Sequence, residues 1–128
     1  HPHYQRMEEL SVMKELGIQV EGWAPFAEGL KGMFTEPVLQ EIAEKHGKTV
    51  PQIILRWDIQ QNVVIIPKSV HQNRMEENLT IWDFELDHED MEKIAQLDKN
   101  VPSMLDCSKP SEIDRLYDYL NNPVLTSL

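Results

Sequence analysis

Apolar residues recur along the chain at two kinds of spacing, which predict helices that alternate with two short strands. Apolar residues three or four positions apart are typical of a helix with one buried face. Apolar and polar residues alternate over residues 18–23, and four apolar residues follow one another over residues 63–66, so both stretches are predicted to be strands. Helical spacing predicts helices over residues 4–16, 35–46, 49–59, 74–82, 87–97 and 111–120.

Residue types at the helix ends support these boundaries. Thr35 is expected to cap the second helix, because its side-chain oxygen can accept a hydrogen bond from a first-turn N–H group. Thr49 and Gln52 have the spacing of a capping box at the start of the third helix. That helix is apolar on more than one side, so we expect it to be well buried, with Trp57 in the core. Trp82 is expected to pack at the end of a later helix.

The stretch around the second strand carries the strongest candidate chemistry. Residues 63–66 are mostly β-branched, which favours a strand buried on both faces, and Pro67 removes a backbone donor where the ladder should end. Lys68 and Ser69 follow at the carboxyl end of the strand, and Arg74 comes one turn into the next helix. Basic side chains beside a helix N-terminus predict a phosphate-binding corner. A βα junction with solvated basic residues explains the same spacing equally well.

The order of the elements indicates the fold class. Strands that alternate with helices predict βαβ units, a parallel sheet and an α/β fold with right-handed crossovers. In the helix over residues 74–82, Met75 and Leu79 are expected to face inward. Two strands alone leave both edges of a sheet bare. We therefore expect the chain to be a piece of something larger, or to complete its sheet with a partner, for instance as a homo-oligomer.

Composition and charge narrow the class of protein. The 128 residues are 41% apolar and 27% charged, which is typical of one folded domain. A net charge of −10 argues against a general nucleic-acid-binding surface or a surface for anionic membranes. Cys107 is the single cysteine, so no internal disulfide can form, which favours a reducing, cytoplasmic location. No apolar run approaches the roughly 18 residues of a membrane span.

The histidines, the cysteine and the first residues of the chain indicate no further functional site. The five histidines lack the spacing of metal ligands, so no metal site is expected. Cys107 lies in an irregular stretch without an obvious histidine partner and is expected to be an inert thiol. The chain begins at His1 without a methionine, which predicts a fragment or a processed product.

Several motifs together resemble a known family. The second strand leads into Ile66-Pro67-Lys68-Ser69, followed at fixed spacing by Arg74, Glu77 and Asn78. Upstream stand V-E-G-W-A-P at residues 20–25 and L-R-W at residues 55–57. From residue 1 to about residue 100, the chain resembles the C-terminal part of the aldo-keto reductases.

The resemblance implies a fold and a domain organisation. The chain would be the C-terminal portion of a TIM-type (β/α)8 barrel, helix-rich and incomplete alone. Residues 18–23 would be the seventh strand of that barrel, and residues 63–67 would be the eighth. Residues 1–128 would form a single partial domain, in which residues 100–128 are a C-terminal loop, helix and tail.

The resemblance also implies a cofactor site. The family reduces aldehydes and ketones with NADPH, which donates a hydride, while a tyrosine supplies the proton. By analogy, Trp23 would stack on the nicotinamide ring, and Arg74 would pair with the 2′-phosphate. The remaining cofactor-binding residues implied are Ala24, Pro25 and Phe26 along the pyrophosphate, Lys68, Ser69 and Val70 at the adenosine phosphate, and Glu77 and Asn78 at the adenine.

The family's catalytic tyrosine, aspartate, lysine and histidine would all precede His1, so no catalytic residue is expected in this chain. Three functions stay open. The chain is part of an NADPH-dependent reductase of small carbonyl compounds, or a truncated, inactive pseudoenzyme that forms an oligomerising helix-rich domain with little or no nucleotide binding. The third possible function is a binding or interaction module that uses the phosphate corner for another phosphate ligand.

Overall fold

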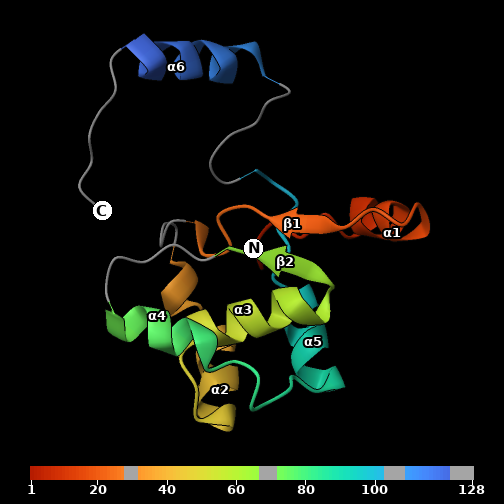
Figure 1. Cartoon of the computed structure of the whole chain (residues 1–128), viewed down its shortest axis with the longest axis vertical. Helices are drawn as coiled ribbons and strands as arrows, with labels where there is room; N and C mark the ends of the chain where they lie inside the picture. The colour runs from red at the N-terminus through yellow and green to blue at the C-terminus, as the bar shows by residue number, and fades with distance from the viewer. Residues whose placement is uncertain (28–31, 67–71, 103–108, 122–128) are drawn as a thin grey trace.

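This computed structural model describes residues 1–27, 32–66, 72–102 and 109–121 (Figure 1). These residues contain two short strands, six α-helices and one 3-10 helix, joined by loops. The order confirms the predicted alternation of helices and strands. The elements are α1 (Met7–Glu15), β1 (Val20–Gly22), η2 (Met33–Thr35), α2 (Pro37–His46), α3 (Val50–Gln60), β2 (Val63–Ile65), α4 (Gln72–Leu79), α5 (His88–Ala95) and α6 (Pro110–Asn121).

The two strands pair in parallel, as the sequence predicts. The register sets Val20 opposite Val63, Glu21 opposite Val64, and Gly22 opposite Ile65. Residues opposite one another point to the same face, so Gly22 shares a face with Val63 and Ile65. A Cβ atom on Gly22 would lie 3.1 Å from a side-chain carbon of Val63 and 3.7 Å from one of Ile65. The absence of a side chain at Gly22 therefore lets the strands and their side chains pack closely on this face.

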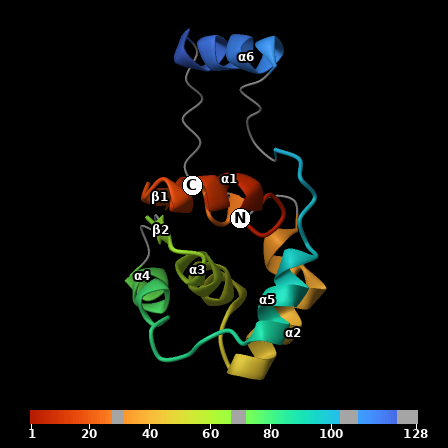
Figure 2. The same ribbon diagram turned by 90° about the vertical axis from the view of Figure 1, so that its right-hand side faces the viewer.

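The prediction that the second strand is buried on both faces is wrong. Val63 is 8% exposed, whereas Val64 is 42% and Ile66 is 70% exposed. α3 packs against β2, and Figures 1 and 2 show it directly beside the strand. Among the described elements nothing covers the opposite face, so apolar side chains that suit a fully buried strand remain in contact with solvent.

α3 is buried along most of its length. Thr49 and Gln52 make the predicted capping box, in which each side chain accepts a hydrogen bond from the other residue's backbone N–H. Trp57 is 2% exposed, which confirms its predicted place in the core. The core around α3 consists of Ala27, Met33, Leu39, Ile42, Ala43, Val50, Ile53, Ile54, Trp57, Leu86 and Ile94. These residues come from α2, α3, α5 and the segments beside them, so the core lies on the helical side of the sheet.

The predicted cap of the second helix is wrong by one residue. Glu36 holds the N-cap position of α2, with extended backbone, and its side chain makes no capping hydrogen bond. Thr35 instead ends η2, where its hydroxyl group donates a hydrogen bond to the backbone oxygen of Gly32 over 3.2 Å. The short 3-10 helix, which the sequence pattern did not predict, therefore uses the threonine that was assigned to α2.

Three apolar residues in α4 and in the loop that follows it point toward solvent rather than inward. Met75 is 46% exposed and Leu79 is 72% exposed, so the prediction that they face inward is wrong. Trp82 is 69% exposed, and the guanidinium group of Arg56 lies 5.9 Å from the centre of its ring. α4 contacts α3 mainly through polar groups, which leaves its apolar positions on the solvent side.

α6 stands apart from the other elements in both views of the molecule (Figures 1 and 2). Its residues Ile113 and Tyr117 are 44% and 63% exposed. Within the part of the chain that the structure describes, no helix is both long enough and apolar enough to cross a membrane.

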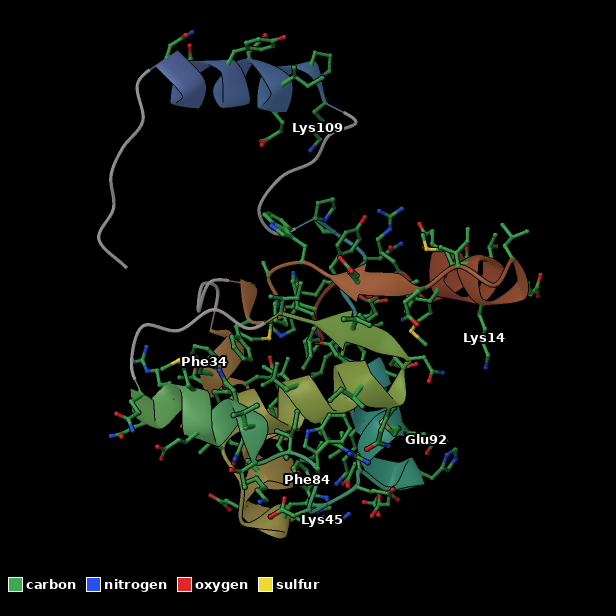
Figure 3. The ribbon with its side chains drawn as sticks, viewed as in Figure 1. Lys14, Phe34, Lys45, Phe84, Glu92 and Lys109 are labelled. Carbon is green, nitrogen blue, oxygen red and sulfur yellow. The ribbon has the colours of Figure 1, made fainter. Side chains whose placement is uncertain are left out.

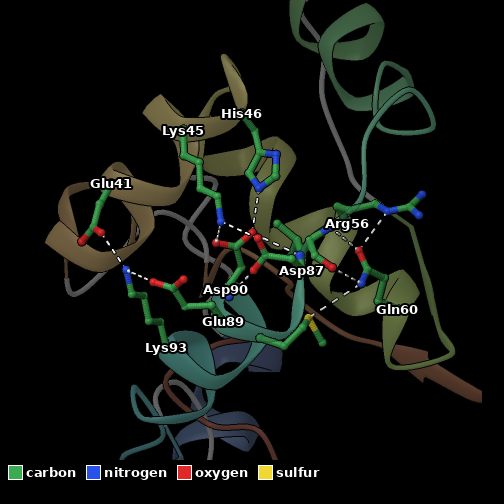
Figure 4. A network of polar contacts seen from close by, with 11 residues as sticks. Glu41, Lys45, His46, Arg56, Gln60, Asp87, Glu89, Asp90 and Lys93 are labelled. Atoms are coloured by element: carbon green, nitrogen blue, oxygen red, sulfur yellow. Dashed lines mark hydrogen bonds and ion pairs between the residues drawn. The ribbon is translucent and has the colours of Figure 1, made fainter.

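Charged side chains connect α2 to α5 (Figure 4). Lys45 Nζ lies 2.5 Å from Asp87 Oδ2 and 2.8 Å from Asp90 Oδ1, and His46 Nε2 lies 2.7 Å from Asp90 Oδ2. The Asp90 side chain is 1% exposed. Burial opposes its ionisation, but the hydrogen bonds from Lys45 and His46 outweigh this and hold the pKa of Asp90 below its ordinary value. Asp90 is therefore a buried carboxylate whose charge is satisfied by two basic partners.

Replacing Asp90 by asparagine should lower the free energy of unfolding near pH 7 by about 1 to 3 kcal/mol, because the buried partner of Lys45 and His46 loses its negative charge and one of its two acceptor oxygens. The pKa of a folded Asp90 lies below that of an unfolded aspartate, about 3.9. Its contribution is therefore complete above that pH and is lost as the pH falls further. Urea unfolding at pH 7, 4 and 3 should show the wild-type advantage over Asp90→Asn shrinking with acidity. Asp118→Asn on exposed α6 is the control, and a constant advantage would contradict the assignment.

Candidate functional site

The turn that follows β1 has a backbone conformation that few residues other than glycine adopt. Ala24 and Ala27 have φ angles of 48° and 47°, in the left-handed region, which costs of the order of 1 kcal/mol each. The Ala27 N–H donates a hydrogen bond to the Ala24 carbonyl over 2.9 Å, and Ala27 is 1% exposed. The rings of Phe26 and Phe34 lie 5.8 Å apart (Phe34 is labelled in Figure 3). Packing beneath the turn therefore holds it in this shape.

The predicted cofactor-binding residues of this turn, residues 23–26, form two groups that differ in exposure. Pro25 is buried, and Phe26 is half-buried against the core. Trp23 is 70% exposed, and Ala24 is half-buried beside it. Trp23 therefore offers a ring on which a ligand could stack, whereas Pro25 and Phe26 anchor the turn from within.

α4 presents its three predicted residues in different ways. Arg74 is exposed, and the first turn of α4 contains no acidic residue that would neutralise it. Glu77 and Asn78 are half-buried. The Thr49 hydroxyl group donates a hydrogen bond to the Glu77 carboxylate, so Glu77 is already engaged by the cap of α3. Arg74 is thus the predicted residue of α4 that is most available to an anion.

Gln52 fixes the end of α4 that lies farther from Arg74. Its Nε2 atom donates to the backbone oxygen of Glu77 over 3.0 Å and to that of Thr80 over 3.2 Å. The Glu77 carbonyl group belongs to the last turn of α4 and also accepts a hydrogen bond from the Thr80 N–H over 3.1 Å, while the Thr80 carbonyl group directly follows the helix. The Gln52 side chain, 6% exposed for the whole residue, therefore ties α4 to α3.

Parallel pairing sets the carboxyl ends of β1 and β2 on the same side of the sheet. Gly22 is opposite Ile65, so the chain leaves β1 and β2 at the same end, and Trp23 follows β1 there. Lys68, Ser69 and Val70 follow β2 in the sequence and lie outside the described residues. Ligands of α/β folds bind at the carboxyl ends of the strands.

A hollow of about 480 Å³ runs along β1. Its lining includes residues 20–24 without a gap. The lining also includes Val63, the partner of Val20 in β2, so the hollow is in contact with both strands. α1 contributes Leu10 and Met13 to the lining, and α3 contributes Trp57 and Asp58. Among the residues that the structure describes, no group of three His, Cys, Asp or Glu side chains could hold a metal ion.

Asp58 places a buried carboxyl group in the wall of this hollow. The residue is 4% exposed, and its Oδ2 atom accepts no hydrogen bond from the described part of the chain. Burial raises the pKa of Asp58 to about 7, although the nearby N-terminal ammonium group acts in the opposite direction. The hollow therefore contains an acid that changes its charge near neutral pH.

Comparison with known proteins identifies the family. Residues 3–99 match the model of the aldo/keto reductase family. The chain belongs to the aldo/keto reductase family. Glyoxal reductase of Bacillus subtilis (strain 168) is 48% identical over 100 residues, which cover 78% of this chain and 36% of that protein. This aldo/keto reductase chain thus spans little more than a third of the length of that relative.

Solved aldo-keto reductase structures agree with the fold of this chain. An aldo-keto reductase from a Medee basin deep-sea metagenome library is 35% identical, with a TM-score of 0.77 over 80% of this chain and 38% of that one. An aldo-keto reductase of the silkworm, Bombyx mori, crystallised in complex with NADPH, is 28% identical, with a TM-score of 0.73 over 80% and 34%. The chain has the fold of part of a TIM barrel, as the resemblance implied.

The sequence pattern did not reveal the structural roles of two buried polar residues, Gln52 and Asp58. Gln52 was assigned only to a helix cap, although a long polar side chain on a well-buried helix also needs partners in neighbouring segments. Asp58 stands in the apolar run of residues 53–59, and this position was an available signal for a buried carboxyl group. The left-handed backbone at Ala24 has no sequence signal, because alanine is not typical of that conformation.

Replacing Gln52 by leucine should lower the free energy of unfolding by about 1 to 3 kcal/mol, because the carbonyl groups of Glu77 and Thr80 lose their shared donor. Hydrogen exchange should increase over residues 72–80 more than elsewhere. Gln40→Leu on the exposed side of α2 is the matched control and should change stability by less than about 0.5 kcal/mol. Equal effects of the two substitutions would contradict the linking role of Gln52.

Replacing Asp58 by asparagine should change how stability depends on pH. The folded pKa of about 7 lies above that of an unfolded aspartate, so wild-type stability falls as the pH rises from about 4 to 7. Asparagine stays neutral, so the stability of Asp58→Asn relative to wild type should rise across that window by an amount of the order of 4 kcal/mol. Urea unfolding at pH 4, 5.5, 7 and 8 measures this, with exposed Glu8→Gln as the control. A flat difference would exclude the raised pKa.

Proposed function

We propose that the chain carries the adenosine-2′-phosphate half of an NADPH site in an aldo-keto (carbonyl) reductase. The parallel register carries this proposal, because it sets the carboxyl ends of β1 and β2 on the same side of the sheet, where the Trp23 turn begins. The silkworm relative was crystallised in complex with NADPH, which supports the choice of cofactor. For the substrate we propose only a chemical class, small carbonyl compounds. Glyoxal is an example of that class, taken from the name of the Bacillus subtilis relative.

In the proposed site, the residues of this chain bind and orient the cofactor. Arg74 pairs with the 2′-phosphate, whose charge approaches −2 at neutral pH, through charge-assisted hydrogen bonds. Lys68, Ser69 and Val70 enclose the adenosine phosphate, and Glu77 and Asn78 contact the adenine. Trp23 stacks on the nicotinamide ring, while Ala24, Pro25 and Phe26 border the pyrophosphate. An exposed arginine near the N-terminus of a helix without acidic first-turn residues fits a phosphate group.

The proposal assigns the chemical step to residues outside this chain. Bound NADPH supplies the hydride, and the proton donor and its partners belong to other parts of the reductase. Residues 1–128 then act as one partial domain, in which residues 100–128 continue beyond the family match. A cytoplasmic location is part of the proposal and rests on the single cysteine, Cys107.

A second candidate function is a helix-rich module that associates through its sheet and binds little or no nucleotide. The exposure of Val64 and Ile66 favours it, because apolar strand residues that remain in solvent are typical of an interaction surface. In this case the 2′-phosphate corner would be a remnant without a ligand.

NADPH titration of the 128-residue chain, followed by tryptophan fluorescence, distinguishes the two functions. Quenching is expected with NADPH and should weaken in Trp23→Phe, because Trp57 is buried and Trp82 lies on another segment. Arg74→Ala should weaken NADPH binding about 10- to 100-fold, since a charge-assisted hydrogen bond contributes about 1.5 to 3 kcal/mol, and should leave NADH binding nearly unchanged.

Matched variants sharpen this measurement. Arg74→Lys keeps the charge without the planar fork and should have an intermediate affinity. Lys14→Ala removes a cation from α1, far from α4 (Figure 3), and should leave the affinity unchanged. Equal binding of NADPH and NADH, or no quenching at all, would refute the cofactor site. Reduction of glyoxal by the isolated chain would refute the assignment of catalysis to other residues.

A further inference from the structure

We propose that Thr49, the cap of α3, is a positioning residue that sets the base specificity of the nucleotide site. Its hydroxyl group holds the Glu77 carboxylate in place. The carboxylate then accepts a hydrogen bond from the 6-amino group of adenine and disfavours purines that carry an oxygen at that position. This role rests on the proposed function, from which it takes the contact between Glu77 and adenine.

The Thr49 hydroxyl group makes two hydrogen bonds with different roles. Its oxygen accepts from the backbone N–H of Gln52 over 3.4 Å, which is the capping contact of α3. A hydroxyl group that accepts in this way keeps its proton for a second partner. Thr49 donates that proton to Oε1 of Glu77. The cap of α3 thus directs a donor at the carboxylate of α4.

Neighbouring contacts hold the backbone of Glu77 as well. Gln52 Nε2 donates to the Glu77 carbonyl oxygen over 3.0 Å. Lys48, the residue before Thr49, forms an ion pair of 2.7 Å with Asp83 in the loop after α4. A glutamate side chain loses much rotamer freedom when it is ordered by a ligand, so a carboxylate that is already held in place favours binding.

The contact with Thr49 also affects Arg74. Arg74, Glu77 and Asn78 are three and four positions apart, so they lie on one face of α4. At a spacing of three residues, Glu77 could form an ion pair with Arg74. The Thr49 hydroxyl group competes with such a pair because it engages the same carboxylate from the side of α3. The Arg74 guanidinium group is then more available to the 2′-phosphate.

A carboxylate only accepts hydrogen bonds, and this decides which bases fit. Adenine has an amino group at position 6, which can donate to Glu77. Hypoxanthine and guanine have a carbonyl oxygen there, and this oxygen would face the carboxylate without a proton between them. A site built to hydrogen-bond one group of a ligand rejects an analogue that lacks the group. A fixed Glu77 carboxylate therefore favours a 6-aminopurine.

The test compares NADPH with its hypoxanthine analogue, in which an oxygen replaces the 6-amino group. Each is titrated into the 128-residue chain and followed by tryptophan fluorescence. The wild-type chain should bind NADPH about 10- to 100-fold more tightly than the analogue, as expected for one charge-assisted hydrogen bond. Thr49→Val should lower this preference to less than about threefold. Thr49→Ser keeps the hydroxyl group and should keep the preference.

Thr49→Asp separates the donor from the cap. Aspartate caps a helix about as well as serine does, but near neutral pH it has no proton to donate. This variant should lose the preference for NADPH while its helical circular dichroism spectrum is retained. In a Glu77→Gln background, Thr49→Val should change the preference no further, because the two residues act through one contact.

Thr80→Val is the matched control. It makes the same chemical change directly after α4, where the Thr80 hydroxyl group donates to the backbone oxygen of Glu76 over 2.9 Å. It should leave the preference unchanged.

The wild-type measurement distinguishes the two ways in which the test can fail. If the wild-type chain prefers NADPH and both Thr49→Val and Thr49→Asp keep that preference, the positioning role is overturned while the cofactor site stands. Equal weakening of both nucleotides in these variants has the same meaning, since it indicates a purely structural cap. Binding of neither nucleotide by the wild-type chain would refute the cofactor site, and the role of Thr49 with it.

Discussion

Burial of α3 is the constraint on which the rest of the structure depends. Three of its polar residues, Gln52, Arg56 and Gln60, are four positions apart and therefore lie on one face of the helix. They donate hydrogen bonds to backbone oxygens of Glu77 and Thr80, of Ile81 and of Leu86, respectively. A single row of side chains thus satisfies the carbonyl groups of the segment between α4 and α5, while the apolar faces of α3 form the core. Loss of this row would leave buried polar groups without partners along the whole segment.

The sequence predicted the parts of the fold that depend on local pattern. The capping box at Thr49, the parallel pairing and the burial of Trp57 all follow from residue type and the order of the elements, and the structure confirms them. One wrong prediction is the Thr35 cap, which lies one residue from the observed N-cap. The others concern Val64, Ile66, Met75 and Leu79, all expected to be buried and all exposed. A pattern of apolar positions indicates which side chains could be buried, but not whether another element lies over them. Among the described residues, no third strand extends the sheet beside Val64 and Ile66.

The candidate site could be predicted as a motif but not as a geometry. The motifs at residues 20–25, 55–57 and 66–69, with Arg74, Glu77 and Asn78 at fixed spacing, were enough to indicate the family. The left-handed backbone of Ala24 and Ala27 and the burial of Pro25 arise from packing between distant segments, which spacing does not encode. The buried carboxyl group of Asp58 is a similar case, since its raised pKa follows from burial by the folded chain and not from its neighbours in sequence.

The two surfaces of this chain are supported in different ways. α4 is attached to α3 by Thr49 and Gln52, so the position of Arg74 is fixed by contacts within the chain. The edge of β1 and the face bearing Val64 have no such support among the described residues, and apolar groups there gain stability when further strands cover them. Arg74 of the proposed phosphate corner therefore lies on a helix that contacts within the chain hold in place. Trp23, the residue proposed for the nicotinamide end, borders the hollow, and its ring is 70% exposed, so that end of the proposed site has less support from the described residues.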